Sequence, residues 1–294
     1  SEARGDFAEA ERIAREVLVI QEGIAPRSNS ELATAYDNVA RYVEQQGRLE
    51  EAMKFKLQSV AIRRVSTDSA SLGSLPYTLN NLAVSYQYMG DMARAESLAL
   101  EATEAEARVR GRRSVPYGST LRNLAGIYES QRRLAEADSV ARLSMDVLRG
   151  TVGAAHPEYL RVVAMLAGIR LNAKDWIGAE QAAREVVQQI GGQMHESHPQ
   201  SAVALQYLGI ARGALQNVSG ADSALRASLA LRRKYLPPEH WAIASSESVL
   251  GHHLGKTGRR AEGEAMLRRA YATLLAARGA DAEPTRKTAE RLAE

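Results

Sequence analysis

The chain has 294 residues, of which 45% are hydrophobic, 25% charged and 5% aromatic, with a formal net charge of +3. This near-average composition excludes a disordered chain, and the charge excess is smaller than nucleic-acid-binding domains normally carry. The absence of cysteine excludes disulfides, thiol nucleophiles and cysteine-ligated zinc. No apolar run is long enough to span a bilayer. We therefore expect no nucleic-acid partner and no membrane insertion within these residues.

Three series of residues recur along the chain in one register, at intervals of 42 or 43 residues. Small residues occur at Ala10, Ala52, Ala95, Ala137, Ala179, Ala221 and Gly263. Larger aliphatic residues occur at Val39, Leu82, Leu124, Leu166, Leu208, Leu250 and Leu292. Each of these is followed by Ala or Gly: Ala40, Ala83, Ala125, Ala167, Gly209, Gly251 and Ala293. Three series in one register indicate an internal structural repeat.

The repeats divide the chain into units that each predict two helices joined by a turn. In chain order, the expected units are a partial repeat at 1–28, complete repeats at 29–71, 72–113, 114–155, 156–197, 198–239 and 240–280, and a partial repeat at 281–294. In the unit at 29–71, Val39 and Ala40 belong to the first helix, which ends at the turn around Gly47. In a typical second helix apolar residues lie four, seven and eight positions after the small residue, as Leu267, Ala270 and Tyr271 follow Gly263, and this is helical spacing. The sequence therefore predicts an all-α solenoid extending over 1–294 as one domain.

Later units depart from this pattern at two places. Arg170 and Arg212 stand where earlier units have Tyr86 and Tyr128. The turn glycine is replaced in three units, by Arg132, Lys174 and Gln216. The three N-terminal complete units therefore fit the pattern best.

The two-helix unit resembles the tetratricopeptide repeat, and its length resembles the kinesin light chain-like subtype that is also found in bacterial signalling proteins. The residues that carry the resemblance are Thr78-Leu79-Asn80-Asn81-Leu82-Ala83-Val84-Ser85-Tyr86, Leu121-Arg122-Asn123-Leu124-Ala125, and the His-Pro pairs at His156-Pro157 and His198-Pro199. The resemblance implies an α-α superhelix of about six complete repeats with a half repeat at each end. It also implies that the first helices line a concave groove that holds a peptide.

The resemblance places the Asn that precedes the Leu of the first helix in this groove. In this sequence the matching residues are Asn38, Asn81 and Asn123. Helical spacing adds residues on the same face: Arg41, Tyr77, Asn80, Tyr88, Arg122, Arg161 and Tyr207. Asp37 and Glu44 lie on the same face, so we expect a polar peptide or a ligand that carries both charges.

Other motifs have structural explanations that compete with chemical ones. His156, His198 and His240 recur with the repeat, which favours a structural role over metal binding. The segment His195-Glu196-Ser197-His198 is one residue short of a zinc-binding helix motif, and the segment from Gly251 to Thr257 is one residue short of a phosphate loop. The sequence therefore predicts no catalytic residues, no cofactor and no metal.

We expect a scaffold that binds a protein or peptide partner and is not an enzyme. Two alternatives remain open. The chain could be the regulatory or sensor region of a larger bacterial serine/threonine kinase, with catalysis elsewhere, or it could self-associate end to end through half repeats. The compartment is not determined by the sequence, and a cytoplasmic location is favoured.

Overall fold

The computed structural model describes residues 2–24, 30–193 and 199–294, and it contains fourteen helices and no strand within these ranges. The first unit, Ser1–Thr151, contains α1 (Glu2–Ile24), α2 (Ser30–Gln45), α3 (Leu49–Val65), α4 (Ser69–Tyr88), α5 (Met92–Val109), α6 (Val115–Ser130) and α7 (Leu134–Val152). The second unit, Val152–Glu294, contains α8 (Pro157–Asn172), α9 (Trp176–Gln193), α10 (Pro199–Ala214), α11 (Val218–Tyr235), α12 (Trp241–Lys256), α13 (Arg260–Arg278) and α14 (Glu283–Ala293). The predicted all-α class is confirmed.

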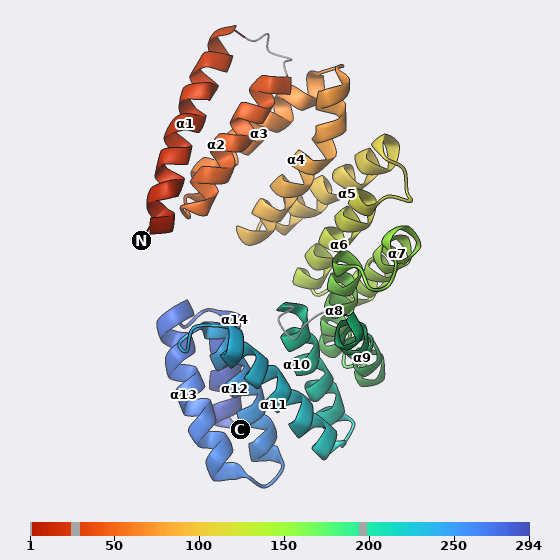
Figure 1. Ribbon diagram of the computed structural model, residues 1–294, viewed down its shortest axis with the longest axis vertical. Coiled ribbons are helices and arrows are strands. Elements are labelled where there is room, and N and C mark those ends of the chain that lie inside the picture. Colours follow the sequence, from red (N-terminus) through yellow and green to blue (C-terminus); the bar gives the residue numbers. More distant parts are fainter. Residues whose placement is uncertain (1, 25–29, 194–198) are drawn as a thin grey trace. The chain divides into compact units, whose positions relative to one another are not determined.

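Helices pair as the repeat predicts (Figure 1). The first helices of the repeats are α2, α4 and α6 in the first unit and α8, α10, α12 and α14 in the second, and the remaining helices are second helices. Within each unit, successive first helices pack side by side, as α2 does with α4 and α10 does with α12. Six helix pairs are complete within the described residues, and α1 and α14 are single helices at the two ends. That the two units form one uninterrupted solenoid stays a prediction.

The recurring aliphatic and small residues form the core of each unit. Leu82 and Leu250 are each 1% exposed, and the small residues that follow them are buried. Helices α12 and α13 approach each other closely, because a methyl group on Gly263 would lie 2.4 Å from the carbonyl oxygen of Gly251. Small residues at these positions are therefore required by the approach of the two helix backbones.

In each of the six complete helix pairs, one residue of the turn between the first and second helix has a left-handed backbone conformation. Gly47, Gly90 and Gly258 have φ angles of 81°, 82° and 90°. The three residues that replace glycine keep this conformation, with φ angles of 63° at Arg132, 60° at Lys174 and 62° at Gln216. The turn geometry is thus retained where the sequence departs from glycine, although a side chain there costs about 1 kcal/mol.

Two of the recurring histidines begin first helices. The backbone N–H of Glu158 donates to Nδ1 of His156 at 3.2 Å, and that of Ala242 donates to Nδ1 of His240 at 3.1 Å. Asp68 and Ser114 cap first helices of the first unit in a similar way. The recurrence of these histidines is explained by helix capping. The segment His195-Glu196-Ser197-His198 lies outside the described residues.

Charged clusters connect successive repeats within the first unit. Arg48 and Arg15 donate to the carboxylate of Glu11 at 2.8 and 2.7 Å, and Gln46 donates to it at 2.7 Å. Burial alone would raise the pKa of Glu11, but the hydrogen bonds from Arg48, Arg15 and Gln46 together lower it to about 2. The same arrangement recurs 85 residues later, where Arg133 and Gln131 donate to Glu96 at 2.7 and 2.8 Å. Each cluster joins the second helix of one repeat to the turn of the next.

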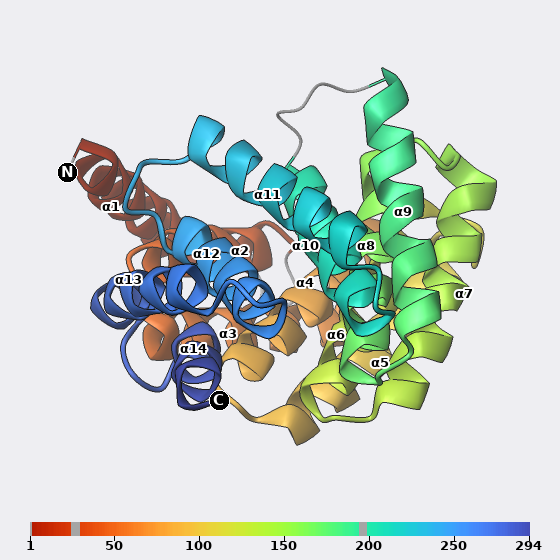
Figure 2. The same cartoon turned by 90° about the horizontal axis from the view of Figure 1, so that it is seen from below.

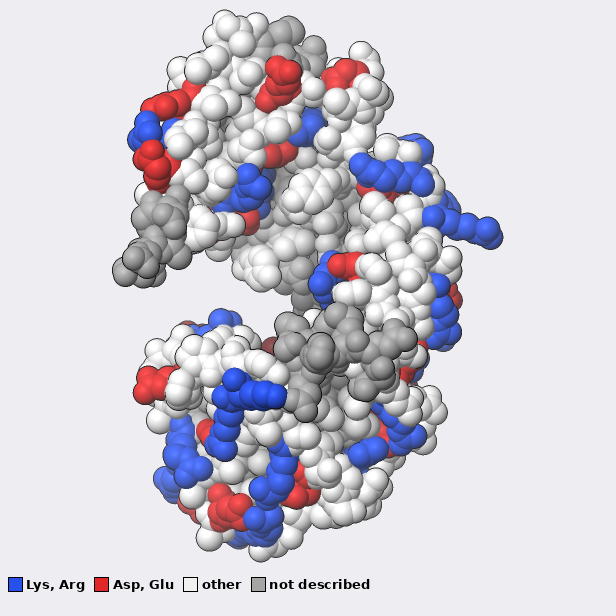
Figure 3. Space-filling model, viewed as in Figure 1, with Lys and Arg blue, Asp and Glu red and all other residues white. Residues whose placement is uncertain are grey.

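None of the helices in the described ranges has the length and apolar character needed to cross a membrane. On the face shown in Figure 3, basic and acidic side chains are interspersed.

Candidate functional site

A hollow of about 370 Å³ lies between α2 and α4 in the first unit. It is lined by five of the predicted groove residues: Asn38 and Arg41 from α2, and Tyr77, Asn81 and Tyr88 from α4. The helical spacing of 3.6 residues per turn explains this arrangement, because residues three, four or seven positions apart share one face of a helix. The structure therefore brings these five residues together on the first-helix face.

Aromatic side chains border this hollow and are open to solvent. Tyr77 is 65% exposed and Tyr88 is 78% exposed. Both belong to α4, eleven residues apart, with Asn81 between them on the same face. Tyrosine provides a large contact area together with a polar group and is enriched at interface hot spots. The α2–α4 hollow can thus offer both apolar contact and hydrogen bonds to a bound chain.

Arg41 is the cation on the surface of the hollow. Its Nη2 atom donates to Oδ1 of Asn38 at 3.1 Å, and its guanidinium carbon lies 4.9 Å from the centre of the Tyr42 ring. These two contacts hold the side chain in place while leaving it exposed. A guanidinium held in this way can donate to a carbonyl or carboxylate of a ligand.

The acidic residues of this face are paired from beneath by cations of the second helix α3. Nη2 of Arg63 lies 2.9 Å from Oδ2 of Asp37, and Nζ of Lys56 lies 2.6 Å from Oε1 of Glu44. Lys56 also donates to Oγ of Ser85 on α4 at 2.7 Å. Because each carboxylate has a buried cationic partner, the charge at the floor of the hollow is largely balanced.

Sequence reasoning missed Lys56 and Arg63, although one signal was present. Lys56 lies four residues after Ala52, at a position that the repeat pattern assigns to an apolar residue. A charged residue at an apolar position must find a partner when it is buried. Arg63, which is 3% exposed, is also a buried cation with an acidic partner, and it lies seven residues further along the same face of α3.

Two other predicted residues contact each other between α4 and α6. Nδ2 of Asn123 donates to Oδ1 of Asn80 at 3.0 Å. Arg122 is half-buried beside Asn123 on α6. The first-helix face of the first unit thus contains eight of the ten predicted residues.

The remaining two predicted residues belong to the second unit. Arg161 is exposed on α8 and lies 2.6 Å from Glu158. Tyr207 is half-buried on α10, where a methyl group built on Gly168 of α8 would lie 3.3 Å from its hydroxyl oxygen. Whether the ten residues form one groove stays a prediction.

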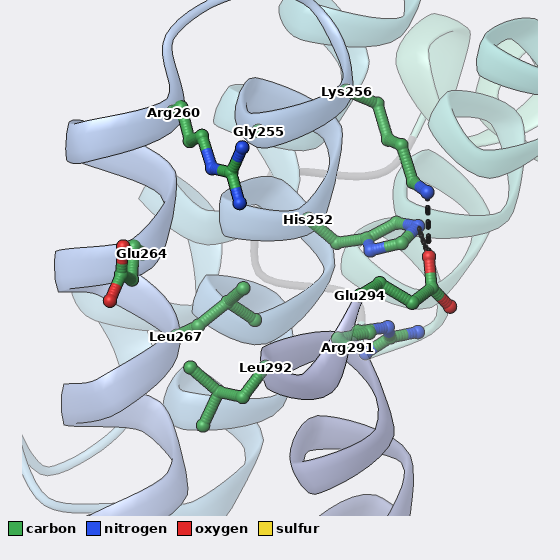
Figure 4. Close-up of a pocket in the computed structure, with 9 residues that line it drawn as sticks. All are labelled: His252, Gly255, Lys256, Arg260, Glu264, Leu267, Arg291, Leu292 and Glu294. Carbon is green, nitrogen blue, oxygen red and sulfur yellow. Dashed lines mark ion pairs between the residues drawn. The ribbon is translucent and has the colours of Figure 1, made fainter.

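A smaller pocket of about 170 Å³ lies between α12, α13 and α14 (Figure 4). Nζ of Lys256 lies 2.7 Å from Oε2 of Glu294, and Nε2 of His252 lies 4.0 Å from the same atom. Burial lowers the pKa of His252, and the charge of Arg291 lowers it further. Arg291 donates to Oγ of Ser248 at 2.8 Å. In this pocket Lys256 and Glu294 are thus paired with each other, and Arg291 is bound to a hydroxyl group.

The segment that resembles a phosphate loop is helical. Residues from Gly251 to Lys256 belong to α12, so their backbone N–H groups lie in a continuous helix and not in an anion-binding loop. Gly251 is explained by its close packing against Gly263.

Two tetratricopeptide repeat models match the chain, one at residues 32–66 and one at residues 74–150. No curated protein matches the sequence. Among solved structures, BtubC (BKLC) from P. vanneervenii is similar with a TM-score of 0.66 and 21% identity, over 79% of this chain and 92% of that chain. A kinesin light chain-like protein with nearly identical TPR-like repeats, from Podosopora anserina, is similar with a TM-score of 0.60 and 21% identity, over 69% of this chain and 96% of that chain. The apo form of RapI has a TM-score of 0.70 and 11% identity, over 92% of each chain.

At these identities the structural similarities show the fold, while the two models match the repeats themselves. Within the described residues the fold is all-α and is built from helix-turn-helix repeats, with six complete helix pairs and a single helix at each end, and its structural neighbours are superhelical repeat proteins. Residues 32–66 and 74–150 thus match tetratricopeptide repeats, and the fold is similar to that of the solved kinesin light chain-like repeat structures. This fold is generally non-catalytic and is typical of protein-interaction scaffolds.

Proposed function

We propose that the chain is an interaction scaffold that holds an extended segment of a protein partner on the first-helix face of its first unit. The observation that carries the proposal is the α2–α4 hollow, which gathers an arginine, two amides and two exposed tyrosines in one place. Exposed tyrosines and an arginine at one hollow are the residue types that dominate binding energy at interfaces.

The chemistry of the face suggests how the partner is held. Asn38 and Asn81 each carry an amide that can both donate to and accept from the backbone of an extended chain. Arg41 adds one positive charge, since Asp37 and Glu44 are already paired with Arg63 and Lys56. We therefore expect a partner segment that is polar or mildly acidic, with apolar side chains that contact Tyr77 and Tyr88.

A peptide-selection experiment tests this proposal. Peptides of about twelve residues, selected from a random display library on the wild-type protein, are then measured against the double variant Asn81→Ala, Asn123→Ala. Losing two amide contacts of roughly 1 kcal/mol each should weaken binding by about tenfold or more, with helicity retained. The matched control is the double variant Gln58→Ala, Gln181→Ala, which removes two exposed amides from second helices.

The proposal predicts that the control binds the selected peptides like the wild type. Equal binding by the asparagine variant and the wild type, with both folded by circular dichroism, would contradict the assignment of the site. Nothing among the described residues favours the alternative of a regulatory region attached to a kinase.

A further inference from the structure

Two arginines occupy equivalent positions in the two units. Arg63 lies eleven residues after Ala52 on α3, and Arg232 lies eleven residues after Ala221 on α11. Both are in the last turn of a second helix, where the helix dipole favours a cation equally in the two cases. Any difference between them must therefore come from the side chains that they contact.

Each arginine reaches residues of the first helices that its own helix packs against. Arg63 donates to Asp37 and Thr34 of α2. Arg232 donates to Gln206 of α10 at 2.7 Å and to Ser246 of α12 at 2.5 Å. Figure 2 shows α11 lying along α10 and close to α12. The partners are equivalent too, because Gln206 follows Asp37 by the same 169 residues that separate Arg232 from Arg63.

The charge of the partner differs between the two units. The carboxylate of Asp37 lies 2.9 Å from Arg63, whereas Arg232 meets the amide oxygen of Gln206, the hydroxyl of Ser246 and the carbonyl oxygen of Ala242 at 2.9 Å. These three acceptors are neutral, and no carboxylate of the described residues pairs with Arg232. The second unit therefore holds a half-buried cation that no carboxylate of the described residues neutralises.

The electrostatics agree with this geometry. Burial lowers the pKa of Arg232. Tyr207, which follows Gln206 on α10, has the opposite effect on this pKa. Glu247, the residue of α12 that follows Ser246, lies 2.6 Å from Arg233 and forms an ion pair with that residue. Arg232 is half-buried, whereas Arg63 is 3% exposed, so its side chain retains contact with solvent. A ligand can thus supply the negative charge that Gln206 lacks.

We propose that Arg232 forms a carboxylate-binding site on the α10–α12 face of the second unit. The guanidinium has five N–H donors, and the three acceptors described above all contact its Nη1 atom. Charge-assisted hydrogen bonds to a carboxylate are about twice as strong as neutral ones. In an interaction scaffold the carboxylate is an acidic side chain or the C-terminus of the partner, and to that extent the inference rests on the proposed function.

The site is tested with acetate as the probe. The Nε–Hε resonance of Arg232, identified by its loss in Arg232→Gln, is followed by NMR while chloride is replaced by acetate at constant ionic strength. The wild type should show a saturable shift. The variant Gln206→Glu places a carboxylate where the amide lies and should weaken acetate binding at least tenfold.

The matched control is Gln181→Glu, which adds the same negative charge on the exposed face of α9. It should bind acetate like the wild type. Gln206→Glu should also raise the thermal midpoint, because it pairs the buried guanidinium, and Gln181→Glu should not. No saturable shift in the wild type, or equal binding by Gln206→Glu and the wild type, would overturn the proposal.

Two short peptides separate the sources of the carboxylate. Acetyl-Gly-Glu-Gly-amide offers only a side-chain carboxylate, and acetyl-Gly-Gly-Gly with a free C-terminus offers only a terminal one. The peptide that binds the wild type more tightly, and that loses affinity in Gln206→Glu, identifies the source. If neither peptide loses affinity in this variant, the result contradicts the site. The acetate result is independent of the peptide selection on the first unit, so each proposal can fail alone.

Discussion

The carboxylate of Glu11 offers a direct test of how successive repeats are held together. Replacing Glu11 with Gln keeps the shape of the side chain and removes its charge, which faces Arg48, Arg15 and Gln46. The side chain of Glu11 is 9% exposed, so solvent screens these contacts only weakly. The substitution should therefore loosen the packing of α1 against α2 and α3.

The magnitude and the pH range follow from the pKa of Glu11. That pKa is lowered to about 2 in the folded chain from 4.5, and one pKa unit corresponds to about 1.4 kcal/mol. The upper limit is thus about 3 kcal/mol at neutral pH, and the partial exposure of Arg48 reduces the expectation to about 1–3 kcal/mol. Because the folded-state pKa is the lower one, the stabilisation is complete above about pH 4.5 and is lost as the pH falls toward 2.

Hydrogen exchange of α1 and α2 is the appropriate assay, because a repeat protein can open locally at one end. Protection in the wild type should fall between pH 5 and pH 2.5, after correction for the intrinsic exchange rate, and Glu11→Gln should start lower and change less. Glu9→Gln is the control, since Glu9 pairs with Arg12 on the exposed face of the same helix and should have a much smaller effect. Equal protection in Glu11→Gln and the wild type at pH 7 would refute the reasoning.

Four further substitutions test the packing and the turns. Leu124 is 4% exposed, so Leu124→Ala should lower the free energy of unfolding by about 2–5 kcal/mol, as measured by urea titration. A loss below about 1 kcal/mol would show that the surrounding side chains fill the cavity. Ala125 is fully buried, so Ala125→Leu should destabilise by about 1–3 kcal/mol through overpacking, and a neutral result would mean that the helix pair is looser than described. Arg132→Gly should stabilise by up to about 1 kcal/mol, because the left-handed turn suits glycine, while Gly90→Ala should destabilise; a shift of both midpoints in the same direction would contradict this account.

The fold could be predicted from the sequence because the repeat imposes the same local requirements six times. Leu82 and Leu250 are four repeats apart and are buried to the same extent. Even the departures were informative: Arg132 keeps the left-handed turn that glycine adopts elsewhere, because the helices on both sides fix the backbone there. Periodic positions of this kind are determined by neighbours in the same repeat and the next one.

The site could be predicted only in part, because it depends on contacts that are not periodic. The shared face of Asn38, Arg41, Tyr77, Asn81 and Tyr88 follows from helical spacing and is found in the structure. Their role in partner binding stays a prediction.

The charge balance beneath this face could not be predicted. A face that carries Asp37 and Glu44 was expected to suit ligands of both charges, but Arg63 and Lys56 reach these carboxylates from the opposite side of the helix layer. Such contacts depend on the positions of the charged ends of long side chains. The spacing of residues in the sequence does not determine those positions.

The charge of the first-helix face depends on contacts between adjacent repeats, because cations of the second helices pair with carboxylates of the first helices. Lys56 contacts Glu44 of one first helix and Ser85 of the next, so it bridges the two walls of the hollow and neutralises one of its carboxylates. Because repeats contact only their neighbours, a change such as Asp37 in one unit to Gln206 in another alters the local charge without disturbing distant repeats. One repeated scaffold can therefore pair the buried cations of α3 with carboxylates at α2–α4 and leave Arg232 without a carboxylate at α10–α12. A ligand that contacts two adjacent first helices would distinguish these two faces.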